Sequence, residues 1–230
     1  MTQLLVSVKN LDEAKIALAT NVDIIDLKNP ADGALGALEP DVIQQVVSYV
    51  AGRKPVSATI GNLPMQAKLI AQKIQQTEYL GVDIIKVGFL DNMQTIDCID
   101  EIHKYKFKTK IMAVIFADQI PSFDLIAKFS AAGFYGVMLD TQSKLTKNLF
   151  DYSKQDDVER FVKTAKSASL FVGLAGKLSV NLFNSALDFS PNFIGVRSAI
   201  CAAEVRESSI CREKITLLTS LLHKNNILKI

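Results

Sequence analysis

The chain alternates between short runs dense in aliphatic and aromatic residues and longer segments in which apolar residues recur at helical spacing. The short runs are typical of buried parallel strands, and the longer segments of amphipathic helices that cover a sheet. The expected strands are 4–8, 23–28, 56–60, 84–89, 111–116, 136–140, 170–175 and 193–198. The expected helices are 12–20, 40–50, 65–80, 93–105, 123–131, 156–167, 180–187 and 209–222. This series of about eight βα units predicts a closed (β/α)₈ TIM barrel.

The pattern covers the whole chain without a linker or low-complexity segment, so we expect a single domain spanning residues 1–230. An open doubly wound sheet is the competing α/β fold. Its nucleotide-binding form carries Gly-x-Gly-x-x-Gly after the first strand, and the sequence has no such motif there. Two segments that follow strands are long, 29–39 and 141–155, and both would lie at the end of the barrel where active sites are built.

Four alternate strands share one sequence register. Aligned, they read DIIDLK (23–28), DIIKVG (83–88), YGVMLD (135–140) and NFIGVR (192–197). Because side chains alternate between the two faces of a strand, the third and fifth positions, all aliphatic, are expected to pack under the helices. The other positions then point into the barrel. They form a layer of Asp26, Lys86, Met138 and Gly195, and nearer the catalytic rim a layer of Lys28, Gly88, Asp140 and Arg197.

Ionisable side chains therefore converge inside the predicted barrel. One interpretation is a buried network of ion pairs that only fills the barrel. Burying several charges is costly, however, and such clusters more often mark function. A lysine in a desolvated site with cationic neighbours loses its proton more easily, as an amine nucleophile requires. Two inward lysines in adjacent layers, Lys28 and Lys86, favour one nucleophile and one proton shuttle, and hence Schiff-base chemistry on small phosphorylated carbonyl compounds.

Small residues follow the last two expected strands. The seventh ends in GLAG (173–176), and in the eighth Gly195 precedes Arg197, Ser198 and an expected short helix near residue 200. Backbone N–H groups and a helix N-terminus at this corner of a barrel are typical of phosphate sites, although tight βα turns also require glycine. We expect phosphate to be bound by Gly176, Gly195, Arg197 and Ser198.

Two features stay open at the level of sequence. The segment 29–39, which contains Gly33 and Gly36, is either a mobile lid over the second strand or a long turn without a catalytic role. Asp118 follows the fifth strand and is either another rim acid or a capping residue.

Composition restricts the partners and the compartment. The charges nearly balance, with 26 Lys+Arg against 24 Asp+Glu, so neither nucleic acid nor a membrane surface is expected as a partner. The three cysteines have no Cys-x-x-Cys spacing, no metal-ligand spacing occurs, and the sequence has neither a signal peptide nor an apolar stretch that could span a bilayer. We expect a cytoplasmic homo-oligomer that uses no metal and no cofactor.

The motifs make the chain resemble the (5-formylfuran-3-yl)methyl phosphate synthase family of methanofuran biosynthesis, also called 4-(hydroxymethyl)-2-furancarboxaldehyde-phosphate synthase. The resemblance is carried by LLVS (4–7), VDIIDLKNPADGALGA (22–37), VSATIG (56–61), IIKVG (84–88), MLDT (138–141), LAG (174–176) and IGVRSA (194–199). DIIDLKNP with its glycine-rich continuation is highly specific, whereas the later glycine motifs occur in many barrels. The chain departs from the family pattern in LLVSV, where a proline commonly follows the serine, and in TNV, where Gly-Gly-Ala precedes DIID.

The resemblance implies a TIM barrel that condenses two glyceraldehyde 3-phosphate molecules into a furan aldehyde carrying one phosphate, with loss of phosphate and two waters. It makes Lys28 the Schiff-base residue and Lys86 the proton acceptor, with Asp26, Asp140 and Lys144 assisting. Two alternatives remain. One is another class I aldolase acting on triose or related sugar phosphates, because fold and lysine chemistry do not fix the substrate. The other is a barrel that binds phosphorylated metabolites without catalysis, which would not need paired inward lysines.

Overall fold

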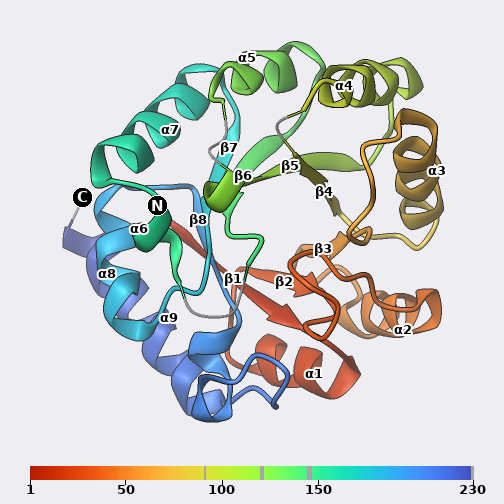
Figure 1. Ribbon diagram of the computed structural model, residues 1–230. Helices are drawn as coiled ribbons and strands as arrows, with labels where there is room; N and C mark the ends of the chain where they lie inside the picture. Colours follow the sequence, from red (N-terminus) through yellow and green to blue (C-terminus); the bar gives the residue numbers. More distant parts are fainter. Residues whose placement is uncertain (91, 120–121, 144–146, 229–230) are drawn as a thin grey trace.

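The computed structural model of the chain describes residues 1–90, 92–119, 122–143 and 147–228. Within these ranges, eight parallel strands close into a barrel in chain order, with β8 pairing back to β1 (Figure 1). The strands are β1 (Gln3–Val8), β2 (Ile24–Leu27), β3 (Val56–Thr59), β4 (Ile84–Phe89), β5 (Lys110–Phe116), β6 (Gly136–Asp140), β7 (Phe171–Leu174) and β8 (Phe193–Val196). The predicted (β/α)₈ barrel is confirmed.

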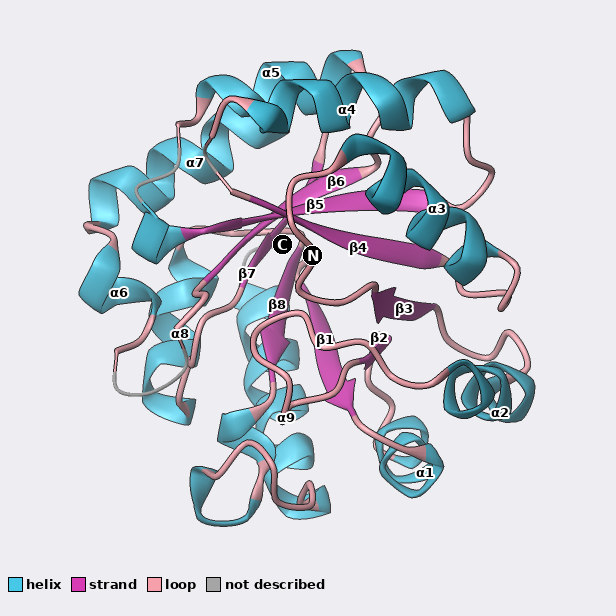
Figure 2. Cartoon of the chain, turned by 45° about the vertical axis from the view of Figure 1, so that its right-hand side comes forward, coloured by secondary structure: helices cyan, strands magenta, loops and turns pink. Residues whose placement is uncertain are grey.

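Helices surround the barrel and cover its strands from outside (Figure 2). They are α1 (Leu11–Ala19), α2 (Pro40–Val50), α3 (Ala67–Glu78), α4 (Gln94–Tyr105), α5 (Asp124–Ala131), α6 (Leu149–Tyr152), α7 (Gln155–Ser167), α8 (Val180–Asp188) and α9 (Arg212–Leu228). Short 3₁₀ turns follow β5 and β8: η1 (Ala117–Gln119), η2 (Ser198–Ile200) and η3 (Ala202–Glu204). The one-turn helix α6 lies in the segment 141–155, where the sequence predicts no helix.

Two separate apolar cores hold the barrel together. The larger core lies between strands and helices, and it contains every aliphatic residue that the strand alignment assigns to the outward face: Ile25, Leu27, Ile85, Val87, Val137, Leu139, Ile194 and Val196. The smaller core fills the barrel interior with the opposite strand faces, including Leu5, Ile24, Ile84, Met112, Val114, Met138 and Phe193. The alternation of faces read from the sequence is therefore confirmed on all four aligned strands.

The segment after β2 enters the barrel interior. Ala34 and Leu35 are buried and belong to the inner core. Leu35 occupies the space over Gly88, where a Cβ atom would come within 2.2 Å of the leucine side chain. Hydrogen bonds to the carbonyl of Gly36 from the backbone N–H of Asn29 (2.8 Å) and the hydroxyl of Thr59 (2.8 Å) close the turn. Of the two interpretations of 29–39, these contacts favour a packed turn over a lid.

The first position of the four-strand repeat fastens the amino-terminal end of the barrel. Oδ2 of Asp23 accepts the backbone N–H of Leu4 in β1 at 2.8 Å, and Oδ2 of Asp83 accepts that of Val56 in β3 at 2.8 Å. Oδ1 of Asn192 accepts the N–H of Val172 in β7 at 2.9 Å. Each side chain thus bonds the strand that precedes its own. In the remaining copy, the third in chain order, the position is taken by Tyr135, which stacks on Phe171.

Replacing Asp23 with alanine is expected to lower the free energy of unfolding by about 1–2 kcal/mol, because the N–H of Leu4 loses its acceptor. Asp23→Asn is expected to keep most of the stability, since Asn192 fills the equivalent position in β8. Urea unfolding measures both. Asp100→Ala, at an exposed position of α4, is the matched control, and an equal loss in Asp23→Ala and Asp100→Ala would contradict the fastening role.

Candidate active site

A cavity of about 460 Å³ opens at the carboxyl ends of the strands. Six residues singled out from the sequence line it: Lys28, Asp140, Gly176, Gly195, Arg197 and Ser198. Ser7, Arg206 and Glu207 add further polar groups to its wall. The residues come from the ends of β1, β2, β6, β7 and β8 and the loops that follow them. This is the end of a (β/α)₈ barrel at which active sites are found.

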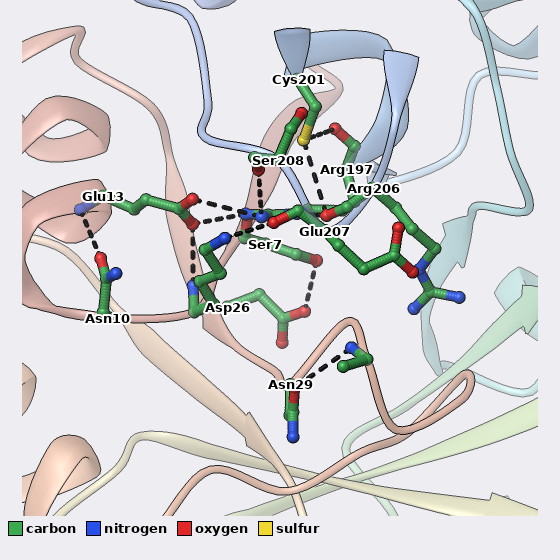
Figure 3. Close-up of polar contacts among 12 residues, drawn as sticks. Ser7, Asn10, Glu13, Asp26, Asn29, Arg197, Cys201, Arg206, Glu207 and Ser208 are labelled. Carbon is green, nitrogen blue, oxygen red and sulfur yellow. Dashed lines mark hydrogen bonds and ion pairs between the residues drawn. The ribbon is translucent and has the colours of Figure 1, made fainter. Parts of the chain in front are cut away.

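A buried carboxylate lies beneath the cavity. Asp26 is fully buried, and both of its oxygens are occupied: Oδ2 accepts the hydroxyl of Ser7 at 2.7 Å, and Oδ1 accepts that of Ser57 at 2.7 Å. Nζ of Lys86 lies 2.6 Å from Oδ1. Figure 3 shows the hydrogen bond between the Ser7 hydroxyl and the Asp26 carboxylate. Burial alone would raise the pKa of Asp26, but the charges of Lys86 and Lys28 and the hydrogen bonds outweigh burial and lower it. The carboxylate is therefore held in its ionised form.

The site has two tiers, as the strand alignment predicts. The lower tier brings Asp26 into contact with Lys86, which is only 2% exposed. Neither residue is among the described residues that line the cavity. The upper tier contains Lys28 and Asp140, which are 8% and 3% exposed and do line it. Lys28 can therefore meet a molecule in the cavity directly, whereas Lys86 lies in the lower tier, in contact with Asp26.

The loop after β6 is fixed by Asp118. Its two carboxylate oxygens accept the backbone N–H groups of Gln142 and Ser143, each at 2.7 Å. Asp140 accepts the N–H of Thr141 at 2.7 Å in the same loop. These bonds favour the interpretation of Asp118 as a residue that caps backbone N–H groups over its interpretation as a reactive acid at the rim. Lys144, which the family resemblance assigns to the site, lies outside the described residues.

Arg197 is held by the protein itself. Its Nε donates to the carbonyl of Arg206 at 2.7 Å, and its Nη1 to the carbonyl of Ser7 at 3.0 Å. Nη2 donates to the carbonyl of Ser208 at 2.9 Å, and both Nη atoms reach the buried carboxylate of Glu13 in α1, at 2.5 and 3.2 Å. These bonds use the five N–H groups of a guanidinium. The sequence predicts that Arg197 binds phosphate. In the structure its N–H donors instead bind backbone carbonyls and Glu13.

Arg206 is the cation that the sequence analysis missed. It lines the cavity, and Nη2 donates to the carbonyl of Gly33 at 2.8 Å, which joins the loop after β8 to the turn after β2. Burial lowers the pKa of Arg206, and the charges of Asp140 and Glu207 partly offset that effect; a guanidinium nevertheless stays protonated in proteins. No motif marks Arg206. The length of the segment between β8 and α9, residues 197–211, is the only sequence feature that could have drawn attention to it.

Within the described ranges, no helix is both long and apolar enough to cross a membrane. The same ranges contain no cluster of three or more His, Cys, Asp or Glu side chains arranged to hold a metal ion.

Eight βα units closed into a barrel, with lysine, aspartate and arginine side chains around a cavity at the strands' carboxyl ends, define a (β/α)₈-barrel enzyme. The sequence model of the 4-HFC-P synthase family matches residues 4–219, and the chain belongs to that family. It is 34% identical to the (5-formylfuran-3-yl)methyl phosphate synthase of Archaeoglobus fulgidus, over 96% of this chain and 99% of that protein. Its identity to the synthase of the same name from Methanopyrus kandleri is 33%, over 93% of this chain and 95% of that protein.

Among solved structures, phosphoribosyl anthranilate isomerase from Thermus thermophilus is similar with a TM-score of 0.67, at 10% sequence identity, over 97% of this chain and 99% of that one. At this level of identity the likeness concerns the fold alone.

Arg197→Met is expected to cost about 3–5 kcal/mol of unfolding free energy, because Glu13 would keep a buried charge without its partner. Adding Glu13→Gln to Arg197→Met should recover part of the loss. Urea unfolding of both variants tests this. The control is Arg160→Met, which removes an ion pair to Asp157 between side chains that are 67% and 44% exposed and is expected to cost no more than about 1 kcal/mol. An Arg197→Met protein as stable as the Arg160→Met protein would rule out the structural role.

Proposed function

We propose that this chain condenses two molecules of glyceraldehyde 3-phosphate into (5-formylfuran-3-yl)methyl phosphate, releasing one phosphate and two waters, in the biosynthesis of a methanofuran-type cofactor. Membership of the 4-HFC-P synthase family supports the product. The observation that carries the chemistry is that a cavity lysine, Lys28, and a buried lysine, Lys86, both lie close enough to Asp26 for their charges to lower the pKa of its carboxyl.

The reaction begins at Lys28. Its Nζ, as the neutral amine, attacks the aldehyde carbon of one triose, and water leaves to give an iminium ion. The iminium nitrogen takes up the electron pair of the adjacent C–H bond when the α-proton is removed, and the family resemblance assigns that proton to Lys86. The enamine then expels the β-phosphate with its C–O electron pair. Carbon–carbon bond formation with the second triose, ring closure and dehydration follow. Hydrolysis of the iminium then consumes one water, breaks the C–N bond and frees Lys28, so that the net loss is one phosphate and two waters.

The phosphate groups are anchored by the loops after β7 and β8. Gly176 adopts a φ of +112°, and a Cβ atom there would lie 2.9 Å from the side chain of Thr141, so glycine is needed for the close turn at this wall. Ser198 begins the 3₁₀ turn η2, beside Gly195 on the cavity wall. Arg206 supplies a further cation, because among the described residues its guanidinium donates one side-chain hydrogen bond, to the carbonyl of Gly33, whereas Arg197 donates five. Backbone donors combined with an arginine are a common way to hold a phosphate.

Borohydride treatment in the presence of glyceraldehyde 3-phosphate is expected to fix a triose adduct on Lys28, identified by peptide mass spectrometry. Lys28→Ala removes the amine and should abolish both the adduct and turnover. Lys177→Ala is the matched control, because Lys177 lines the same cavity but has no part in the mechanism. Adduct formation undiminished in Lys28→Ala would refute the Schiff-base assignment. The mass of the product from glyceraldehyde 3-phosphate alone separates furan formation from another class I aldolase reaction.

Arg206→Gln is expected to raise KM for glyceraldehyde 3-phosphate by about 10-fold to 100-fold, since a charge-assisted hydrogen bond contributes about 1.5–3 kcal/mol. Steady-state kinetics measure this effect, with Arg160→Gln on α7 as the control arginine outside the cavity. A KM in Arg206→Gln equal to that of the control would remove Arg206 from the phosphate site.

A further inference from the structure

We propose that Ser7 is a proton relay between the cavity and the buried pair of Asp26 and Lys86. The inference deepens the proposed function and rests on it. It answers a difficulty in the geometry: Lys86 and Asp26 are buried and do not belong to the described lining of the cavity, yet the proposed reaction transfers the α-proton of a triose bound to Lys28 to this pair.

Ser7 has contacts on both sides of this barrier. It lines the cavity at the end of β1, and its hydroxyl donates to Oδ2 of Asp26 at 2.7 Å (Figure 3). The same carboxylate contacts Nζ of Lys86 through Oδ1, at 2.6 Å. A continuous chain of short contacts therefore runs from the cavity through Ser7 and Asp26 to Lys86. The position of Ser7 is fixed by Arg197, whose Nη1 binds its carbonyl oxygen at 3.0 Å.

The direction of the hydrogen bond suits proton uptake. An ionised carboxylate only accepts, so the Ser7 hydroxyl proton is directed at Asp26, and the oxygen lone pairs of Ser7 are available to a donor. When the C–H bond of the iminium breaks, its electron pair moves toward the iminium nitrogen and its proton bonds to Oγ of Ser7. The original hydroxyl proton passes to Oδ2 of the Asp26 carboxylate, which becomes a neutral carboxylic acid that still contacts Lys86 through Oδ1. One C–H bond is lost, and one O–H bond of the buried pair is gained.

Ser57 provides an internal comparison. Its hydroxyl donates to the same carboxylate at the same distance, 2.7 Å, but through Oδ1. Ser57 is fully buried in β3 and is not among the described residues that line the cavity. If the two serines only satisfied and oriented Asp26, their removal would have equal consequences. If Ser7 is a relay, removal of the Ser7 hydroxyl slows proton transfer and removal of the Ser57 hydroxyl does not.

The test compares Ser7→Ala with Ser57→Ala in the full-length protein. The key measurement is the rate at which deuterium is released to solvent from glyceraldehyde 3-phosphate deuterated at C2, corrected for release without enzyme. Ser7→Ala is expected to lower this rate about 100-fold, the size of a general acid–base contribution, while the borohydride adduct on Lys28 still forms. Ser57→Ala should keep the rate within about 3-fold of the wild type. Ser7→Thr, which retains the hydroxyl, should restore most of it.

Equal loss in Ser7→Ala and Ser57→Ala, or an unchanged rate in Ser7→Ala, would overturn the relay. Urea unfolding checks that both variants fold, and Ser7→Cys, which nearly preserves volume, replaces Ser7→Ala if the alanine variant does not. The pH profile of kcat is a second readout, because the relay predicts that Ser7→Ala loses the low-pH limb, which protonation of the buried base produces, while Ser57→Ala retains it. Failure of the wild type to form furan would refute the proposed function, whereas normal furan formation with equal serine variants would refute only the relay.

Discussion

The ion pair between Lys86 and Asp26 constrains the register of half the barrel. Two charges removed from water cost several kcal/mol each unless they are paired and hydrogen-bonded. The carboxylate obtains its partners because Ser7, Asp26 and Ser57 are cross-strand neighbours in β1, β2 and β3. A slip of one residue in β2 would turn Asp26 toward the aliphatic layer under the helices. The proposed catalytic chemistry and the strand pairing therefore depend on the same contact.

Much of this arrangement could be predicted from the chain, because it follows from strand alternation. The aligned strands place Asp26 and Lys86 in one layer and Lys28 and Asp140 above it, and the structure brings the first pair to 2.6 Å and puts the second pair on the cavity wall. The sequence analysis did not predict that Asp23, Asp83 and Asn192, at the first position of the repeat, bind the backbone of the preceding strand. Whether a side chain reaches the neighbouring strand depends on the tilt and stagger of the strands in the closed barrel. The alternation of residues along a single strand gives no information on that tilt or stagger.

The structural role of Arg197 and the place of Arg206 in the cavity wall could not be predicted. Both depend on contacts between elements that are distant in sequence and that no repeat or spacing relates. Arg197 occupies a rim position next to small residues, and its residue type favours phosphate binding. Its partner Glu13 is on α1, a helix distant in sequence, and nothing in the spacing relates the two. The buried Arg197–Glu13 pair instead connects α1, β1 and the segment that contains Arg206 and Ser208. An arginine that stands out in the sequence can thus serve the scaffold, while an arginine without a motif, Arg206, lines the cavity.

The turn after β2 and the loop after β8 share the wall of the cavity, and one hydrogen bond couples them. Arg206 donates to the carbonyl of Gly33, and that turn begins directly after Lys28 and ends with Leu35 packed in the barrel interior. A phosphate held by Arg206 would therefore act on a segment whose two ends are the proposed Schiff-base lysine and the apolar core. Because the core is close-packed, it resists displacement, so such coupling would favour one placement of Lys28 relative to the anchored phosphate. Orientation of this kind accounts for a large part of the barrier reduction in reactions that join two small substrates.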